Sequence, residues 1–385
     1  MSRLFKNCYL VTPDFEHENM SVLVENGKVK RIFAPEDVLV PADEITDCGN
    51  AVLMPGFVDV HCHGRSGFDF TDAKVEAVAQ IAKDKLAEGV TTVLPTTLTL
   101  SEEQLSATLG SIAEYAASPE AACGAKIPGV HLEGPYINQK LIGAQNPAYL
   151  RLPDIAEVAR LNDIFPVCKV SYAPEIEGGA VFASELLAMG ITPSAVHTNA
   201  TYQEFLDAWN HGLRNLSHFC NQMTALHHRD IGVVGAGLLH DDVFIEFICD
   251  KLHICPDMIK LVFSLKSIDR IQLISDAMRA SGMPDGEYDL GGMQTFVKNG
   301  AARLANGALA GSTLQICDAL ANVSEITGFA LSQLVKVTSY NQAESLKLKG
   351  IGKIEPGYQA DFVLLDDDFK VLETYVDGEL RYSAE

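Results

Sequence analysis

Histidine and carboxylate side chains stand at the ends of several short apolar runs in this sequence. One run leads into His61-Cys62-His63, and a later run ends at Glu133. Side chains alternate along a strand with a period of two, so His61 and His63 would lie on one side and could bind one ion. The same position after later runs is taken by His197, His218 and Asp276.

These residues have an ordinary alternative role as well. A single histidine such as His197 or His218 is more often a hydrogen-bonded core residue than a metal ligand. Imidazoles and carboxylates together at equivalent strand ends favour a metal site instead. The six predicted ligands are His61, His63, Glu133, His197, His218 and Asp276.

The six ligands can form two subsites. A three-ligand set that leaves a position open for water is formed by Glu133, His197 and His218. A second set is formed by His61, His63 and Asp276, with Glu133 able to bridge. Zinc is the usual ion for histidine-rich nitrogen and oxygen ligation, while iron, manganese and cobalt suit the same groups. The sequence therefore predicts one or two divalent ions per subunit.

Composition limits the class of partner. The chain has 385 residues, with 51 acidic and 29 basic side chains and a formal charge of -22. Such a charge repels nucleic acids and anionic membranes unless a basic patch intervenes, and the sequence contains no such patch. The nine cysteines form no Cys-x-x-Cys pair, which favours free thiols in a reducing compartment. No apolar stretch has the length of a signal or a membrane span, so we expect a soluble, cytoplasmic protein.

Two sequence patterns divide the chain, one at both ends and the other between them. Residues 1–54 and 354–385 read as short strands with turns, and we expect these two ends to pair in one small β-sandwich domain. Residues 55–353 alternate apolar runs with helical stretches, which predicts parallel strands and helical crossovers. The eight apolar runs are 57–60, 91–95, 127–132, 167–173, 191–196, 213–217, 244–248 and 271–275.

Eight such units predict an α/β fold, a (β/α)₈ TIM-like barrel. The alternative is an open doubly wound sheet, but no Gly-x-Gly-x-x-Gly follows the first run. In a barrel the reactive groups lie at the carboxyl ends of the strands, which is where the six predicted ligands fall.

Longer motifs resemble a known superfamily. The stretch MPGFVDVHCHG at 54–64 and the stretch GKIEPGYQAD at 352–361 are similar to the amidohydrolase superfamily. More specific motifs resemble the N-acetylglucosamine-6-phosphate deacetylase family within it, and the resemblance covers nearly the whole chain. These motifs are HLEGPY at 131–136, SHFCNQMT at 217–224, HRDIGVVGAG at 228–237, SDAM at 275–278 and LAGS at 309–312.

The resemblance implies hydrolysis of N-acetyl-D-glucosamine 6-phosphate to D-glucosamine 6-phosphate and acetate in amino-sugar catabolism. A metal would lower the pKa of its bound water to about 7 and so supply hydroxide near neutral pH. Asp276 would accept the proton of that water and pass it to the sugar nitrogen. The family's carbonyl-polarising histidine is replaced here by Gln145, whose amide can donate a hydrogen bond but cannot become cationic.

The resemblance also implies a substrate site and a homodimer. Arg229 would reach the substrate phosphate from the partner subunit. The family's Asp-Gly-x-His reads here Asp250-Lys251-Leu252-His253, which adds a positive charge near the pocket. The expected substrate-binding residues are Ala144, Gln145, Asn221, Gln222, Arg229, His253, Leu309, Ala310 and Gly311.

Three alternatives stay open at this stage. The same reaction on N-acetylgalactosamine 6-phosphate differs at one sugar stereocentre. A cyclic amidase or deaminase of the superfamily is disfavoured by Glu133, which stands where those members carry a lysine, and by Arg229. A catalytically inactive scaffold protein on this fold would be expected to have lost ligand positions, and all six are present.

Overall fold

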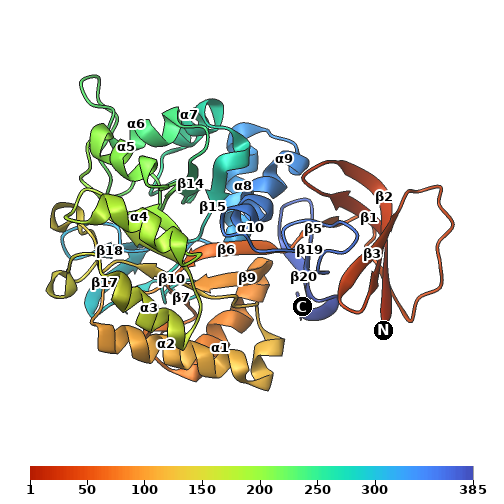
Figure 1. Cartoon of the computed structure of the whole chain (residues 1–385). Helices are drawn as coiled ribbons and strands as arrows, with labels where there is room; N and C mark the ends of the chain where they lie inside the picture. Colours follow the sequence, from red (N-terminus) through yellow and green to blue (C-terminus); the bar gives the residue numbers. More distant parts are fainter. Residues whose placement is uncertain (385) are drawn as a thin grey trace.

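The computed structural model describes residues 1–384, and a closed ring of parallel strands lies at the centre of its larger part (Figure 1). Strands β10 to β15 pair in chain order, and β6 pairs with β9. Bridges at Thr96–His131 and Cys62–Ala277 join these two groups and close the ring. The strands are β6 (Phe57–Cys62), β9 (Val90–Pro95), β10 (Val130–Glu133), β11 (Val167–Tyr172), β12 (Thr192–Ala195), β13 (Asn215–Leu216), β14 (Phe244–Phe247) and β15 (Ile271–Leu273). Each of the eight apolar runs overlaps one of these strands, so the barrel prediction is confirmed.

Helices follow the strands and cover the outside of the barrel (Figure 1). Helix α2 begins at a capping box, in which Ser101 accepts a hydrogen bond from the Gln104 amide. Its apolar face, including Leu105 and Leu109, is fully buried. The helices are α1 (Val75–Asp84), α2 (Glu102–Ala117), α3 (Ile155–Ile164), α4 (Gly179–Ala188), α5 (Tyr202–Asn210), α6 (Gly232–Leu239), α7 (Pro256–Leu265), α8 (Ile316–Thr327), α9 (Leu331–Val335) and α10 (Asn341–Ser345). None of these described helices is long and apolar enough to cross a membrane.

A second sheet joins the two ends of the chain. Its order is β21-β20-β19-β5-β1-β2-β3, with β4 paired to β1. The antiparallel pair of β5 and β19 connects the N-terminal strands to the C-terminal strands, as the strand-like sequence pattern of both ends predicts. The strands are β1 (Ser2–Val11), β2 (Glu16–Glu25), β3 (Lys28–Phe33), β4 (Glu44–Asp47), β5 (Val52–Pro55), β19 (Phe362–Leu365), β20 (Val371–Val376) and β21 (Glu379–Ser383).

A three-stranded antiparallel sheet, which was not predicted from the sequence, is inserted after the last barrel strand. It consists of β16 (Gly286–Leu290), β17 (Met293–Lys298) and β18 (Ala301–Leu304). The turn between β17 and β18 is Asn299-Gly300, and both residues have positive φ, 50° and 72°. An Asn-Gly pair between alternating residues is a hairpin signal, so this element could have been found.

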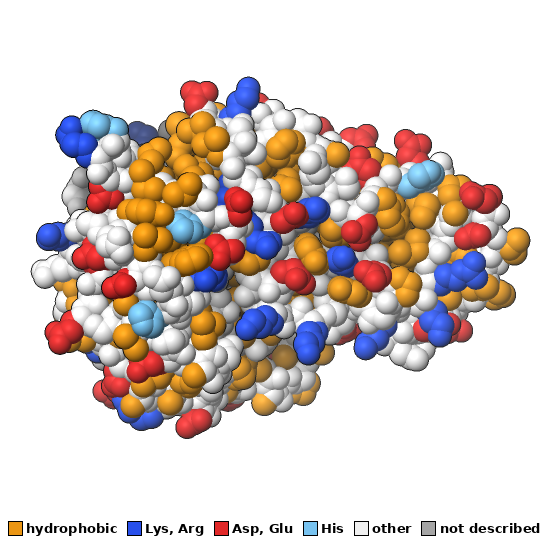
Figure 2. All heavy atoms as spheres, turned by 45° about the horizontal axis from the view of Figure 1, so that its top comes forward, with side chains coloured by type: hydrophobic (Ala, Val, Ile, Leu, Met, Phe, Trp, Pro, Cys, Tyr) orange, Lys and Arg blue, Asp and Glu red, His pale blue; other side chains and the backbone are white. Residues whose placement is uncertain are grey.

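The surface carries charges of both signs. Figure 2 shows Lys and Arg side chains scattered among Asp and Glu on one face, with hydrophobic side chains between them. Among the described residues on this face, no continuous basic area of the kind that a nucleic-acid backbone requires is present.

Candidate metal centre

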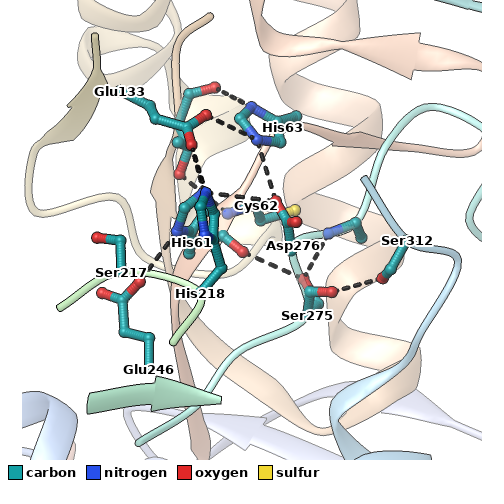
Figure 3. Close-up of polar contacts among 12 residues, drawn as sticks. His61, Cys62, His63, Glu133, Ser217, His218, Glu246, Ser275, Asp276 and Ser312 are labelled. Atoms are coloured by element: carbon teal, nitrogen blue, oxygen red, sulfur yellow. Dashed lines mark hydrogen bonds and ion pairs between the residues drawn. The ribbon is translucent and has the colours of Figure 1, made fainter. Parts of the chain in front are cut away.

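All six predicted ligands lie together at the carboxyl ends of the barrel strands, and all six are buried. Two groups of ligand atoms lie close enough to hold an ion each, and both include Glu133. The first group is Glu133, His197 and His218, and the second is His61, His63 and Glu133. Figure 3 shows Glu133 and Asp276 approaching the imidazoles from different sides.

The first group converges on one carboxylate oxygen. Glu133 Oε1 lies 3.3 Å from His197 Nε2 and 3.1 Å from His218 Nε2. The two imidazole nitrogens are themselves 3.3 Å apart. Two nitrogens and one oxygen are the donor types that zinc and related divalent ions prefer.

The second group is completed by Asp276. Its Oδ1 lies 3.4 Å from His61 Nε2 and 3.2 Å from His63 Nε2. Glu133 Oε2 lies 3.4 Å from His63 Nε2, so the two oxygens of Glu133 face different groups. His61 Nε2 is fully buried and has no hydrogen-bond partner among the described residues. A buried nitrogen without a partner costs free energy, and a bound cation would remove that cost.

In three of the histidines, Nδ1 is held by a backbone carbonyl, so that Nε2 is free to act as a ligand. His63 Nδ1 lies 3.2 Å from the Thr96 carbonyl oxygen, and His197 Nδ1 lies 2.7 Å from that of Leu141. His218 Nδ1 is 3.2 Å from the carbonyl oxygen of Asn221. A carbonyl can only accept, so these rings donate through Nδ1 and present the Nε2 lone pair to the site. The donor set therefore fits a divalent cation.

The backbone at three ligands is in the left-handed region. The φ angles of His197, His218 and Asp276 are 43°, 31° and 49°. This region is strained for residues other than glycine and persists where the surroundings hold it. Asp276 is held from both sides, because its N–H donates to the His61 carbonyl (2.8 Å) and its carbonyl accepts from the Ser312 N–H (2.7 Å).

The carboxylates are stabilised in their charged form. Burial opposes ionisation of Glu133, but the close contacts of its carboxylate with His197 and His218 outweigh this effect and hold the pKa of Glu133 well below its usual value. Burial also opposes ionisation of Asp276, but the electrostatic effect of His61 and the contact with His63 leave its pKa lowered. Burial lowers the pKa of His218 and so favours the neutral imidazole.

A cavity of about 210 Å³ opens above the ligands. Gln145 borders it and is fixed at both ends of its amide: the Thr99 N–H donates to Oε1 (2.8 Å), and Nε2 donates to Glu133 Oε2 (2.7 Å). Leu290 of the inserted sheet also borders it. The expected substrate-binding residues that line this cavity are Ala144, Gln145, Asn221, Gln222, His253, Leu309 and Gly311.

Two expected substrate-binding residues lie outside this lining. Ala310 is completely buried between two lining neighbours. Arg229 is exposed, and its Nη1 lies 2.8 Å from His228 Nε2. The positive charge expected from Lys251 is paired outside the cavity, because its Nζ lies 2.6 Å from Glu325 Oε2 on α8.

The structure places two further carboxylates against site histidines, and neither was predicted to be a site residue. Asp250 Oδ2 lies 2.7 Å from His253 Nδ1, which turns His253 Nε2 away from this carboxylate. Glu246 Oε2 lies 2.9 Å from His61 Nδ1. The spacing of three residues between Asp250 and His253 was a usable signal, whereas Glu246 is 185 residues from His61 and nothing local marks it.

The barrel and its ligand groups define a hydrolase of the amidohydrolase superfamily, a class that depends on divalent metal ions. A family model described as "Amidohydrolase family" matches residues 285–381. The N-acetylglucosamine-6-phosphate deacetylase of Lysinibacillus sphaericus is 35% identical over 99% of this chain and 98% of its own. The N-acetylgalactosamine-6-phosphate deacetylase of Escherichia coli O157:H7 is 35% identical over 87% of this chain and 89% of its own.

A solved structure agrees. It is a mutant N-acetyl-D-glucosamine-6-phosphate deacetylase from Mycobacterium smegmatis in complex with N-acetyl-D-glucosamine-6-phosphate. It is 28% identical, covers 99% of this chain and 100% of its own, and superposes with a TM-score of 0.92. The chain belongs to the N-acetylglucosamine-6-phosphate deacetylase family.

Proposed function

We propose that this protein hydrolyses N-acetyl-D-glucosamine 6-phosphate to D-glucosamine 6-phosphate and acetate, as a step of amino-sugar catabolism. The observation that carries the proposal is the shared carboxylate of Glu133, whose two oxygens face two groups of imidazoles beneath one cavity. The full-length similarity to deacetylases of this name supports the substrate class.

The ion is proposed to be zinc, in one or two copies. Glu133, His197 and His218 would hold the first ion. A bound divalent ion would polarise the acetyl carbonyl and lower the pKa of water in the site. The second ion would be held by His61, His63 and Asp276, with Glu133 between the two ions.

Asp276 is the proposed general base and then general acid. It is 7% exposed and borders the cavity, so a water molecule and the sugar nitrogen can both come within its reach. The neighbouring His61 and His63 outweigh the effect of burial and lower the pKa of Asp276, so the group is a carboxylate at neutral pH and can accept a proton from water. It would then return that proton to the departing amine.

Gln145 is proposed to stabilise the oxyanion. Its amide cannot turn over without losing the Thr99 hydrogen bond, so Nε2 stays directed into the site. One of its two hydrogens is used by Glu133, and the second can reach the acetyl oxygen. One such donor is typically worth about 2.7–4 kcal/mol in the transition state.

The sugar phosphate would be held by polar side chains at the cavity rim and by the backbone of residues 309–311. Asn221, Gln222 and His253 supply the side chains within one subunit. Arg229 lies on an exposed loop outside its own cavity, which favours delivery across a homodimer interface. A guanidinium suits this role because it can donate two parallel hydrogen bonds to a phosphate.

The chain is proposed to divide into a catalytic barrel of residues 55–353 and a small domain made of residues 1–54 and 354–385. The pairing of β5 with β19 supports this division. The nine cysteines are free thiols in the structure, which suits the proposed cytoplasmic location.

A kinetic panel tests the proposal. The four substrates are N-acetylglucosamine and N-acetylgalactosamine, each with and without the 6-phosphate, and acetate release is measured. We expect the highest kcat/KM for N-acetylglucosamine 6-phosphate and a large loss when the phosphate is absent. A preference for the galacto epimer would assign the protein the activity of its Escherichia coli relative instead. Activity on none of the four would overturn the proposal.

A further inference from the structure

Three buried side chains form a line across the barrel beneath the second ligand group. Lys169 on β11, Glu246 on β14 and His61 on β6 are 1%, 2% and 0% exposed. Glu246 Oε1 contacts Lys169 Nζ, and its Oε2 lies 2.9 Å from His61 Nδ1 (Figure 3 shows the second contact). Lys169 and Glu246 do not line the cavity, so neither residue is placed to touch the substrate.

The contact between Glu246 and His61 determines which nitrogen of His61 carries the proton. Oε2 of Glu246 accepts, so His61 Nδ1 donates and Nε2 keeps its lone pair. Burial lowers the pKa of Lys169 well below its usual value. The proton between Lys169 and Glu246 can reside on Nζ or on Oε1, and in both cases Oε2 remains an acceptor. The direction of the hydrogen bond to His61 therefore does not depend on the charge state of the pair.

The partner of His61 differs in kind from those of the other imidazoles. His63, His197 and His218 are oriented by backbone carbonyls, whereas His61 is oriented by a side chain. A buried carboxylate is costly without a compensating partner, and Lys169 provides that partner. Among the described contacts, no backbone carbonyl accepts a hydrogen bond from His61 Nδ1. The Lys169–Glu246 pair places a carboxylate there as the acceptor.

We propose that the Lys169–Glu246 pair is a positioning device that fixes the tautomer and orientation of His61 and so controls the metal affinity of the second subsite. The inference rests on the proposed metal site and deepens it. Nε2 of His61 is 3.4 Å from Asp276 Oδ1 and lacks any hydrogen-bond partner among the described residues, as a ligand nitrogen prepared for a cation would. Supporting hydrogen bonds of this kind typically change metal affinity by about 10–100-fold.

Two matched double variants test the proposal. Lys169→Met with Glu246→Gln removes the charged pair but retains an amide oxygen that can accept from His61 Nδ1. Lys169→Met with Glu246→Leu removes the same pair and leaves no acceptor. Replacing a buried ion pair by apolar residues of similar volume is often neutral for folding, and thermal unfolding checks this for both variants. Zinc affinity at each subsite is then measured by chelator competition, with metal per chain counted by mass spectrometry.

We expect the glutamine variant to bind the second ion within a few-fold of the unmodified protein. The leucine variant should lose affinity for the second ion by about 10–100-fold, while the first ion, held by Glu133, His197 and His218, stays bound in both. If the Lys169–Glu246 pair only stabilised the fold, the zinc affinities of both subsites would change equally in the two variants.

Equal second-ion affinity in the two variants would overturn the inference, and so would an unmodified protein that binds no second ion. These failures differ from a failure of the proposed function. The unmodified protein would still release acetate from the sugar phosphate if only the inference were wrong, and it would not do so if the proposed function were wrong.

Discussion

The terminal sheet and the carboxyl end of the barrel bury side chains of opposite character. In the terminal sheet the ring of Phe5 packs edge-on against the rings of Phe362 and Tyr375, with centroid distances of 5.3 Å and 4.8 Å. At the barrel end, imidazoles and carboxylates are equally buried. Burial of apolar rings stabilises a fold, whereas burial of ionisable groups costs free energy unless they are paired or bind a cation. The first region is therefore explained by stability, and the second requires a function.

A third buried cluster sharpens this contrast. Lys85 Nζ lies 2.8 Å from Asp59 Oδ2 and 2.9 Å from Glu88 Oε2, and Arg65 pairs with the same glutamate. Cations and anions are balanced there, so the cluster needs no ligand. At the metal centre, Glu133 and Asp276 face imidazoles and pair with no lysine or arginine among the described residues, and one ring nitrogen there has no hydrogen-bond partner. The absence of a counter-cation distinguishes a site from a structural ion pair.

Removal of a proposed ligand should have the largest effect. Glu133→Gln and His218→Ala each take a donor from the first ligand group, so bound metal should fall and acetate release should drop below detection. Metal per chain and turnover are measured on the same sample. Glu120→Gln makes the same chemical change on an exposed helix and should leave both values unchanged. Full metal content with a normal rate in either ligand variant would remove that residue from the site.

Asp276→Asn should reduce rate more than metal content. An amide cannot accept and return a proton, and loss of general acid–base catalysis typically costs roughly 10²–10⁴-fold in kcat. The first ion should remain, because its ligands are Glu133, His197 and His218. The measurement is kcat together with metal per chain, and an unchanged kcat would reject the acid–base role.

Arg229→Ala should impair hydrolysis of the phosphorylated sugar alone. Loss of a hydrogen bond to a charged group costs about 1.5–3 kcal/mol, so kcat/KM for the phosphorylated sugar should fall by roughly 10- to 150-fold. The unphosphorylated sugar should be almost unaffected. Arg160→Ala, an exposed arginine paired with Glu102, is the control and should preserve the selectivity. Unchanged selectivity in the Arg229 variant would defeat the phosphate assignment.

Co-expression of two impaired chains tests where Arg229 acts. An Asp276→Asn chain can lend its arginine to an Arg229→Ala partner, which creates one site with both residues intact. We expect kcat/KM for the phosphorylated sugar in the verified heterodimer to exceed that of either variant alone. Loss of selectivity without recovery would place Arg229 in the site of its own subunit.

Phe362→Ala in the terminal sheet should have the smallest effect on catalysis. Phe362 is fully buried against Phe5, and truncation of such a ring typically lowers the free energy of unfolding by about 3–5 kcal/mol. The kcat/KM of the protein that stays folded should remain within a few-fold of its original value. Denaturant unfolding and kinetics at low temperature separate the two quantities. A catalytic loss without destabilisation would show that the terminal sheet shapes the site.

The sequence was most informative where function and local pattern coincide. The barrel strands are apolar runs followed by polar residues, so His61, Glu133 and Asp276 could be assigned to strand ends from the sequence alone. The inserted sheet β16–β18 was missed because its strands are half exposed and carry no continuous apolar run. The amide contact of Gln145 with Glu133 and the support of His61 by Glu246 were missed for a different reason. They depend on the closure of the barrel, which brings distant strands together.

Deacetylation should depend on an ion held by the ligand groups that share Glu133. Anomalous diffraction at the zinc absorption edge, from crystals of protein shown to be active, locates this ion. We predict a strong peak between Glu133, His197 and His218, with any second peak between His61, His63 and Asp276. An active protein whose crystals show no peak at Glu133 would contradict this dependence.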